Sequence, residues 1–258
     1  MNRPVLTAQG LTVRFGGLIA LNALDLNLQG NEILGLIGPN GSGKTTFFNA
    51  VTGLYRTASG TVTIDAADIT GATPQRISRA GIARTFQRSR LCLSLSIFDN
   101  VMIGNHRNLD HRLSTTLFRR GALRNQIERC QAQAHTLLNT FSKTLAARMH
   151  EPVAALTMID RRRVEICRAL ISKPRILLLD EPSAGMTHDE THELMDDLLA
   201  ARTLLPALSV ILIEHEMNVI ERITDRCAVL NYGQKICEGS YREVAADDAV
   251  RKAYLGED

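Results

Sequence analysis

Eight residues near the start of the chain, Gly38–Thr45, have the types and spacing needed to hold a phosphate chain. They fit the pattern G-x-x-x-x-G-K-[ST]. Glycines let successive main-chain N–H groups turn toward phosphate oxygens, which a Cβ atom would obstruct. The segment follows an apolar run, Ile33–Ile37, and opens a predicted helix, Thr45–Val51, whose positive N-terminus attracts the same anion. The sequence therefore predicts a nucleoside triphosphate site.

Two side chains of this segment have separate predicted roles. The Lys44 ammonium can reach the β- and γ-phosphates and act in catalysis, and the Thr45 hydroxyl can ligate Mg²⁺. A chance glycine-rich turn is the alternative, but the flanking strand and helix argue against it. The residues expected to contact the nucleotide are Gly38, Pro39, Asn40, Gly41, Ser42, Gly43, Lys44, Thr45 and Thr46.

A pair of acidic residues, Asp180-Glu181, follows the four aliphatic residues Ile176–Leu179. At the end of a buried strand, Asp180 can hold Mg²⁺ through water, and Glu181 can polarise the attacking water molecule. Taken alone, such a pair is more typical of a strand that runs into a turn. Together with the phosphate loop, it predicts a hydrolytic site with Glu181 as its base.

Two further polar residues gain meaning only from their order along the chain. Gln87 ends the run Arg84–Gln87, and His215 ends the run Ile211–His215 at the tip of a predicted strand. In isolation, Gln87 would be a surface residue and His215 a structural one. Their positions relative to the phosphate loop and the acidic pair make both of them candidates for the site.

The hydrophobic pattern predicts an α/β fold that can position these residues. Apolar residues alternate in the first 28 residues, which indicates antiparallel strands, whereas Ile33–Ile37 is continuously apolar apart from Gly35, like a strand covered on both faces. Between Ile127 and Phe141 the apolar residues recur at steps of three and four, as in an amphipathic helix. We expect one domain of 258 residues, with a nucleotide-binding core at 1–87 and 156–258 and an inserted helical subdomain at 88–155. Residues 108–121 show little periodicity and are not assigned.

Composition excludes several other classes of protein. A net charge of +3 and an aromatic fraction of 4% give no basis for nucleic-acid binding, so no nucleic-acid partner is expected. The arginine clusters at 119–120 and 161–163 are predicted to be solvated helix faces or subunit contacts. No apolar run is long enough to span a bilayer. Five scattered cysteines are predicted to be small buried hydrophobic residues: Cys92, Cys130, Cys167, Cys227 and Cys237.

In this order, the motifs closely resemble those of the ATP-binding-cassette (ABC) ATPases. The matching residues are Gly38–Thr45, Gln87, Asp180–Met186 and Glu214-His215, and the resemblance covers essentially the whole chain. It implies that Phe15 stacks on adenine, that Gln87 joins the Mg²⁺ shell, and that His215 contacts the γ-phosphate in catalysis. It also implies a head-to-tail dimer, in which Ser183–Met186 meets the opposite subunit. The implied cofactors are ATP and Mg²⁺.

Finer features resemble the ATPases of branched-chain amino acid importers. They include Val13–Gly17, Thr85–Gln87 followed by Arg90-Leu91, and the ending Ala253–Gly256. The implied partners are a second, non-identical ATPase, two membrane-spanning permease subunits and an extracytoplasmic solute-binding protein, with this chain on the cytoplasmic face of the inner membrane. Importers of urea or short amides and the ATPase of lipopolysaccharide export share much of this pattern and are the alternatives.

The signature motif of the family, close to Leu-Ser-Gly-Gly-Gln, is altered in this chain. The corresponding segment is Leu156-Thr157-Met158-Ile159-Asp160-Arg161, with Ile159 in place of glycine and Arg161 where glutamine is common. Glycine lets a main-chain N–H approach the γ-phosphate of the partner, and a β-branched side chain crowds that approach. Tolerated drift, a slow second ATP site, and replacement of the lost donor by Arg161 are three competing interpretations.

Three rival functions follow from the same residues. A P-loop kinase would need an acceptor pocket and would not explain Gln87, Ser183–Met186 and His215 together. An ABC ATPase acting on nucleic acid usually carries two cassettes or a long coiled coil, and this sequence shows neither. A regulatory subunit with little hydrolysis would suit the altered signature but not Glu181 and His215. We therefore expect an ATPase coupled to transport, with amino acid import as its function.

Overall fold

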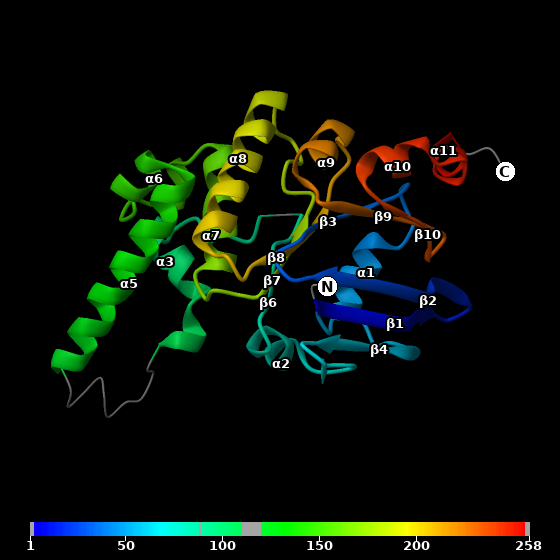
Figure 1. Cartoon of the computed structure of the whole chain (residues 1–258). Coiled ribbons are helices and arrows are strands. Elements are labelled where there is room, and N and C mark those ends of the chain that lie inside the picture. Colours follow the sequence, from blue (N-terminus) through cyan, green and yellow to red (C-terminus); the bar gives the residue numbers. More distant parts are fainter. Residues whose placement is uncertain (1–2, 88, 110–119, 256–258) are drawn as a thin grey trace. The chain divides into compact units, whose positions relative to one another are not determined.

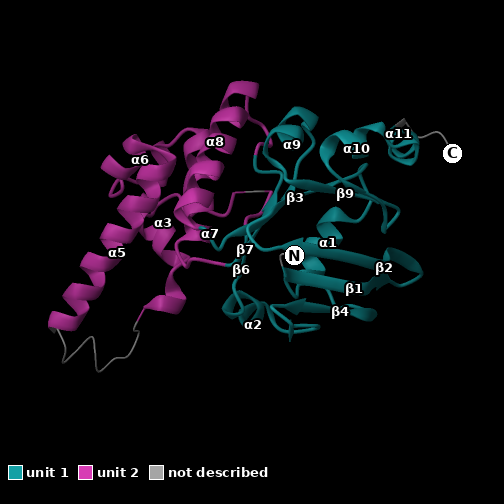
Figure 2. Ribbon diagram, in the orientation of Figure 1, with its two compact units in different colours: residues 1–84, 175–182, 206–258 teal, residues 85–174, 183–205 magenta. Residues whose placement is uncertain are grey.

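The structure is a computed structural model that describes residues 3–87, 89–109 and 120–255. It contains two compact units, whose elements are labelled in Figure 1 and which are coloured separately in Figure 2. The first unit consists of residues 1–84, 175–182 and 206–258, and the second of residues 85–174 and 183–205. The second unit includes more of the chain than the helical insertion expected at 88–155. The domain boundaries themselves stay a prediction.

The first unit begins with an antiparallel sheet in the order β2-β1-β4-β5. Leu6 and Ala8 of β1 are buried, as the alternating pattern predicts, but Val5 and Thr12 are buried as well, because the pairing with β2 shifts register at four places. Leu11 and Val13 are fully covered, whereas Phe15 at the end of β1 is 45% exposed. The strands are β1 (Pro4–Phe15), β2 (Leu18–Gln29), β4 (Ser59–Ile64) and β5 (Ala67–Asp68).

A second sheet of six strands carries the candidate site, in the order β10-β9-β3-β8-β7-β6. Its central strands are parallel and buried along their whole length, so they read as continuous apolar runs. The strands are β3 (Ile33–Ile37), β6 (Ile82–Arg84), β7 (Ile176–Asp180), β8 (Ser209–Ile213), β9 (Arg226–Asn231) and β10 (Gln234–Gly239). The predicted strands at 33–37, 176–179, 210–213 and 228–230 are confirmed.

Helix α1 joins this sheet to the antiparallel one through a shared core. Phe47 and Phe48 of α1 are fully buried in a cluster that also contains Leu36, Leu178 and Ile211. Because these two rings anchor α1, they also anchor the end of the loop that joins β3 to α1. The helices of this unit are α1 (Lys44–Val51), α2 (Pro74–Arg79), α9 (Met217–Ile223), α10 (Tyr241–Ala246) and α11 (Asp248–Leu255).

The second unit is helical in the part of the chain that the structure describes. Its elements are α3 (Ile97–Ile103), η1 (His106–Asn108), α5 (Arg120–Phe141), α6 (Lys143–Ala147), η2 (Val153–Ala155), α7 (Met158–Leu170) and α8 (His188–Leu204). The predicted amphipathic helix is confirmed as α5, and its residues Cys130, Ala134, Leu138 and Phe141 are buried. Ile127 is 46% exposed, so its predicted burial was wrong. An apolar stripe is buried only as far as neighbouring helices cover it.

Two arginines of the 161–163 cluster are buried, which corrects the prediction of a solvated helix face. Arg163 is 6% exposed and pairs with Asp160 of its own helix and with Glu193 and Asp197 of α8. Burial raises the pKa of Asp197 to about 6, against the opposing effect of Arg163. Arg162 is 7% exposed and pairs with Glu165. Arg163 therefore links α7 to α8.

Some predictions about single residues are confirmed and others corrected. Cys130, Cys167 and Cys227 are buried as expected, Cys237 is partly buried, and Cys92 is exposed, contrary to the prediction. The side chains of the arginine pair at 119–120 and most of the unassigned segment 108–121 lie outside what the structure describes. Of the helices within the described ranges, none has the length and apolar character needed to cross a bilayer.

Candidate nucleotide site

The loop between β3 and α1 has a shape that depends on its first and last glycines. Gly38 has a φ of 143°, and a Cβ atom there would lie 2.1 Å from the Leu230 carbonyl oxygen. Gly43 has a φ of 108°, and a Cβ atom would lie 2.9 Å from the Ala20 carbonyl oxygen. Any other residue would clash with the main chain at these positions. The loop is therefore built on residues without side chains, as the sequence indicates.

Main-chain N–H groups of this loop are free to bind an anion. Within the described residues, no protein atom accepts a hydrogen bond from the N–H groups of Gly41, Gly43, Lys44 or Thr45. They lie at the N-terminus of α1, where the helix carries a partial positive charge. Unpaired N–H groups at a helix N-terminus form a ready-made binding site for phosphate.

Lys44 lies under this loop with its side chain almost fully covered. It is 6% exposed, and its Nζ donates hydrogen bonds to the carbonyl oxygens of Gly38 at 2.7 Å and Pro39 at 2.9 Å. Burial lowers the pKa of Lys44, and the nearby carboxylates of Glu181 and Asp180 partly oppose this effect. A phosphate chain would replace main-chain carbonyls as the partner of this cation.

Asp180 ends strand β7 and is held by an arginine that the sequence analysis did not single out. Its carboxylate accepts a hydrogen bond from Arg84 at 2.7 Å, and both side chains are more than nine-tenths buried. Arg84 ends the neighbouring strand β6 and also donates to Asn49 of α1 at 2.6 Å. Arg84 therefore fixes the acidic residue relative to the helix that follows the phosphate loop. The sequence analysis named Arg84 only as the first residue of the run Arg84–Gln87 and predicted no strand at 82–84.

Removing Arg84 should strongly destabilise the first unit. Arg84→Met leaves the buried Asp180 carboxylate without its partner, and the loss of one member of a buried ion pair costs about 3–5 kcal/mol. Urea unfolding of the full chain would measure the change.

The exposed pair of Arg175 and Asp65 provides a matched control. Its two side chains are 51% and 37% exposed, so Arg175→Met should cost less than about 1 kcal/mol. Equal losses of stability for the two variants would contradict the structural role assigned to Arg84.

Glu181 has an unusual backbone conformation and a specific partner. Its φ is 47°, a left-handed value that non-glycine residues seldom adopt and that is often found at functional sites. The main-chain N–H of Glu181 donates to Ile213 of β8 at 2.9 Å. Its Oε1 lies 2.8 Å from Nε2 of His215, which follows the same strand. The structure thus brings together the predicted base and the predicted histidine.

Phe15 offers an aromatic surface in the same unit. Its ring packs edge-on against Tyr55, with the ring centroids 5.0 Å apart, and remains 45% exposed. A partly exposed ring fixed by a second ring can stack on a purine base. The adenine contact of Phe15 stays a prediction.

Gln87 and the altered signature segment belong to the helical unit. Arg162 donates to the carbonyl oxygens of Phe86 and Gln87, at 3.0 and 3.2 Å, and so anchors the main chain at Gln87. The role of Gln87 toward Mg²⁺ stays a prediction. The segment 157–161 starts α7, with the Thr157 hydroxyl accepting a hydrogen bond from the Asp160 N–H at 3.3 Å.

Neighbouring side chains of the signature segment differ in exposure. Ile159 is 7% exposed, whereas Met158 is 53% exposed. Arg161 donates to the Ala154 carbonyl oxygen at 2.8 Å. Of these two residues at the start of α7, only Met158 therefore has an exposed side chain.

A phosphate loop before a helix, at the carboxyl edge of a parallel sheet that also carries an Asp-Glu pair, defines a P-loop nucleoside triphosphatase. Comparison with known families makes this class more specific. The family model for ABC transporters matches residues 21–184, and a model for branched-chain amino acid ATP-binding cassette transporters matches residues 234–258. The chain belongs to the ABC transporter family and is one of its ATP-binding cassette ATPases.

Individual relatives agree with this assignment. The chain is 38% identical to LivG of Salmonella typhimurium, a high-affinity branched-chain amino acid transport ATP-binding protein, and the match covers 100% of both chains. BraF of Pseudomonas aeruginosa, which carries the same description, is also 38% identical over the full length of both. A crystal structure of a nucleotide-free ATP-binding cassette from an ABC transporter has a TM-score of 0.83 at 27% identity, covering 99% of this chain and 100% of that one. The predicted fold class is confirmed.

Proposed function

We propose that this chain hydrolyses ATP to energise the import of branched-chain amino acids. The contact of 2.8 Å between Glu181 and His215, in the same unit as the phosphate loop, is the observation that supports hydrolysis at this site. The full-length similarity to LivG and BraF supports the substrate class. An importer of urea or short amides and a lipopolysaccharide exporter remain the alternatives from the sequence.

The oxygen donors of the site suit Mg²⁺. Mg²⁺ is usually bound through one or two carboxylates together with substrate phosphates and water, and it needs no cage of protein ligands. The Asp180 carboxylate and the hydroxyl of the exposed Thr45 are such oxygen donors, and Gln87 is the third proposed ligand. When bound, the ion would neutralise charge on the phosphate oxygens. Among the described residues, no cluster of three or more His, Cys, Asp or Glu side chains competes as a metal site.

Each candidate residue has a separate proposed role in hydrolysis. The free N–H groups of the loop and Lys44 bind and orient the phosphates, and Phe15 holds the base. Glu181 accepts a proton from the attacking water, and its hydrogen bond to His215 fixes the carboxylate in one orientation. We assign to His215, whose side chain is 49% exposed, the contact with the γ-phosphate.

The proposed assembly contains a second ATPase subunit, two membrane-spanning permease subunits and an extracytoplasmic solute-binding protein, with this chain on the cytoplasmic face of the inner membrane. Uptake of radiolabelled leucine should be lost in cells that lack this chain and restored by the wild-type gene but not by Glu181→Gln. Cells that lose urea uptake and keep leucine uptake would refute the substrate assignment.

We also propose that the ATP site completed by residues 157–161 turns over slowly. Met158→Gly should raise the ATPase rate of the purified chain, at concentrations that allow dimers, by up to about 10²-fold, because it removes an exposed side chain at the start of α7, where main-chain N–H groups would approach the phosphate. Ile159→Gly should mainly cost stability, since that side chain is buried. Substantial turnover of the wild-type chain that neither variant raises would rule out a slow site.

A further inference from the structure

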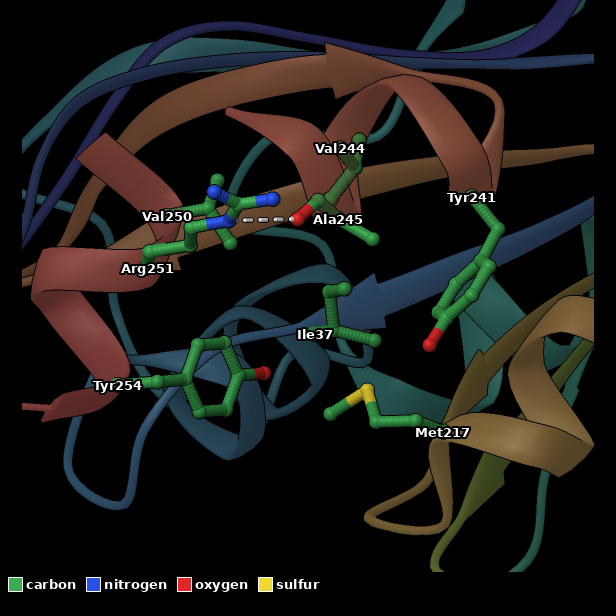
Figure 3. Close-up of a pocket in the computed structure, with 8 residues that line it drawn as sticks. All are labelled: Ile37, Met217, Tyr241, Val244, Ala245, Val250, Arg251 and Tyr254. Atoms are coloured by element: carbon green, nitrogen blue, oxygen red, sulfur yellow. Dashed lines mark hydrogen bonds between the residues drawn. The ribbon is translucent and has the colours of Figure 1, made fainter. Parts of the chain in front are cut away.

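A cavity of about 320 Å³ lies in the first unit, beneath the two C-terminal helices. We call it the C-terminal pocket. Its walls come from the end of β3, the start of α9, and α10 and α11, as Figure 3 shows. The volume is at the lower end of the range of about 300–1,000 Å³ found for small-molecule sites. The lining residues are Ile37, Met217, Tyr241, Val244, Ala245, Val250, Arg251 and Tyr254.

The wall of this pocket is mostly apolar, and its polar groups are two tyrosine hydroxyls and one guanidinium. In Figure 3 the hydroxyl groups of Tyr241 and Tyr254 both point toward the space around Ile37. Burial raises the pKa of each tyrosine, so both hydroxyls stay protonated at neutral pH and can donate hydrogen bonds. An apolar cavity with a few converging polar groups is the usual form of a small-molecule site.

The charges around the pocket favour an anion. Arg251 donates from Nε to the Ala245 carbonyl oxygen at 3.2 Å, and within the described part of the chain no carboxylate pairs with it. None of the eight lining residues is acidic. Glu221 influences Tyr241 from outside the lining and is itself 3.6 Å from Arg242. A ligand with a positive charge would therefore find no anionic partner in the wall.

We propose that the C-terminal pocket binds an aliphatic monocarboxylate, with its hydrocarbon part among Ile37, Val244 and Val250 and its carboxylate at Arg251. A tyrosine hydroxyl would donate to the same carboxylate, because a hydrogen bond to an ionised group is stronger than one between neutral groups. This site is separate from the nucleotide site and does not depend on which solute the transporter carries.

The pocket is directly connected to the phosphate loop. Ile37 immediately precedes Gly38, and the main chain of Gly38 lowers the pKa of Tyr254, which opposes part of the effect of burial. Lys44 binds the carbonyl oxygen of the same glycine. A ligand that changes the position of Tyr254 or Ile37 should therefore change ATP affinity, and ATP should change the affinity of the ligand by the same factor.

Two matched probes test the proposed chemistry on the purified full-length chain. 4-Methyl-2-oxopentanoate and leucine share a carbon skeleton, but only leucine carries an ammonium group. Isothermal titration should show the oxo acid binding about tenfold or more tightly than leucine, and Arg251→Gln should remove most of its affinity. Octanoate tests whether the natural ligand is a fatty acid rather than a branched oxo acid. The carboxylate that binds more tightly identifies the class of ligand. Leucine binding as tightly as the oxo acid would overturn the proposal.

Two neighbouring alanines of α10 locate the binding site. Both are exposed, but only Ala245 lines the pocket. Ala245→Phe should fill the cavity and weaken carboxylate binding by about tenfold or more, whereas Ala246→Phe should leave it unchanged. No saturable binding of either carboxylate at millimolar concentration, or equal binding to both variants, would overturn the proposal. Loss of permease association in Ala245→Phe without carboxylate binding would show that a protein segment occupies the pocket instead.

Discussion

Lys44→Ala should abolish ATP hydrolysis and weaken ATP binding by about tenfold to a hundredfold, since hydrogen bonds to a charged group contribute about 1.5–3 kcal/mol. The Lys44 ammonium is buried beneath the phosphate loop and bonded to the carbonyl oxygens of Gly38 and Pro39. A bound phosphate chain would accept these hydrogen bonds and pair its negative charge with the cation. Alanine leaves the loop without that charge. Titration with a fluorescent ATP analogue and a phosphate-release assay would measure both effects.

The exposed Lys252 of α11 is the control for charge alone. Lys252→Ala removes one positive charge from the same unit without touching the phosphate loop, so affinity and turnover should stay at the wild-type level. Unchanged nucleotide affinity and turnover in Lys44→Ala would refute the nucleotide site, and with it the proposed ATPase function.

Glu181→Gln should slow hydrolysis by about 10²–10⁴-fold while ATP binding is kept, as expected when a general base is removed. Glutamine has nearly the same size and can still form a hydrogen bond with His215, but its amide cannot accept a proton from water. The variant should therefore retain intact ATP. Separation of the protein from free nucleotide, followed by chromatography of the bound nucleotide, would show whether ATP or ADP is present.

Glu221→Gln is a matched substitution on α9, in the same unit. Its carboxylate is 47% exposed and is not part of the site, so the rate should not change. A Glu181→Gln variant that hydrolyses ATP at the wild-type rate would show that another group activates the water. His215 would then be the next residue to examine, because it is the direct partner of Glu181.

The phosphate loop could be predicted from sequence because its chemistry is local. Gly38, Gly43 and Lys44 lie within seven consecutive residues, and their types follow from main-chain geometry alone. The buried strands β3, β7 and β8 were equally clear, since continuous apolar runs are typical of a parallel sheet covered on both faces. In these parts of the chain, local pattern and final structure depend on the same physical constraints.

Features that depend on distant partners could not be predicted in this way. Arg84 and Asp180 are 96 residues apart, and only the pairing of β6 with β7 brings them together. Ile127 matches the apolar period of α5 but lies beyond the part that other helices cover. Arg163 is charged and lies in a basic run, yet three carboxylates on two helices surround it. Burial of such residues is a property of packing rather than of local sequence.

The ion pairs of Arg163 have a consequence for how the helical unit opens. They tie the first turn of α7, through Asp160, to Glu193 and Asp197 of α8. Two helices that share a buried cation cannot separate without exposing it, so the amide hydrogens of both should exchange with deuterium in one cooperative step. The amide hydrogens in the first turn of α7 would then exchange as slowly as those of α8.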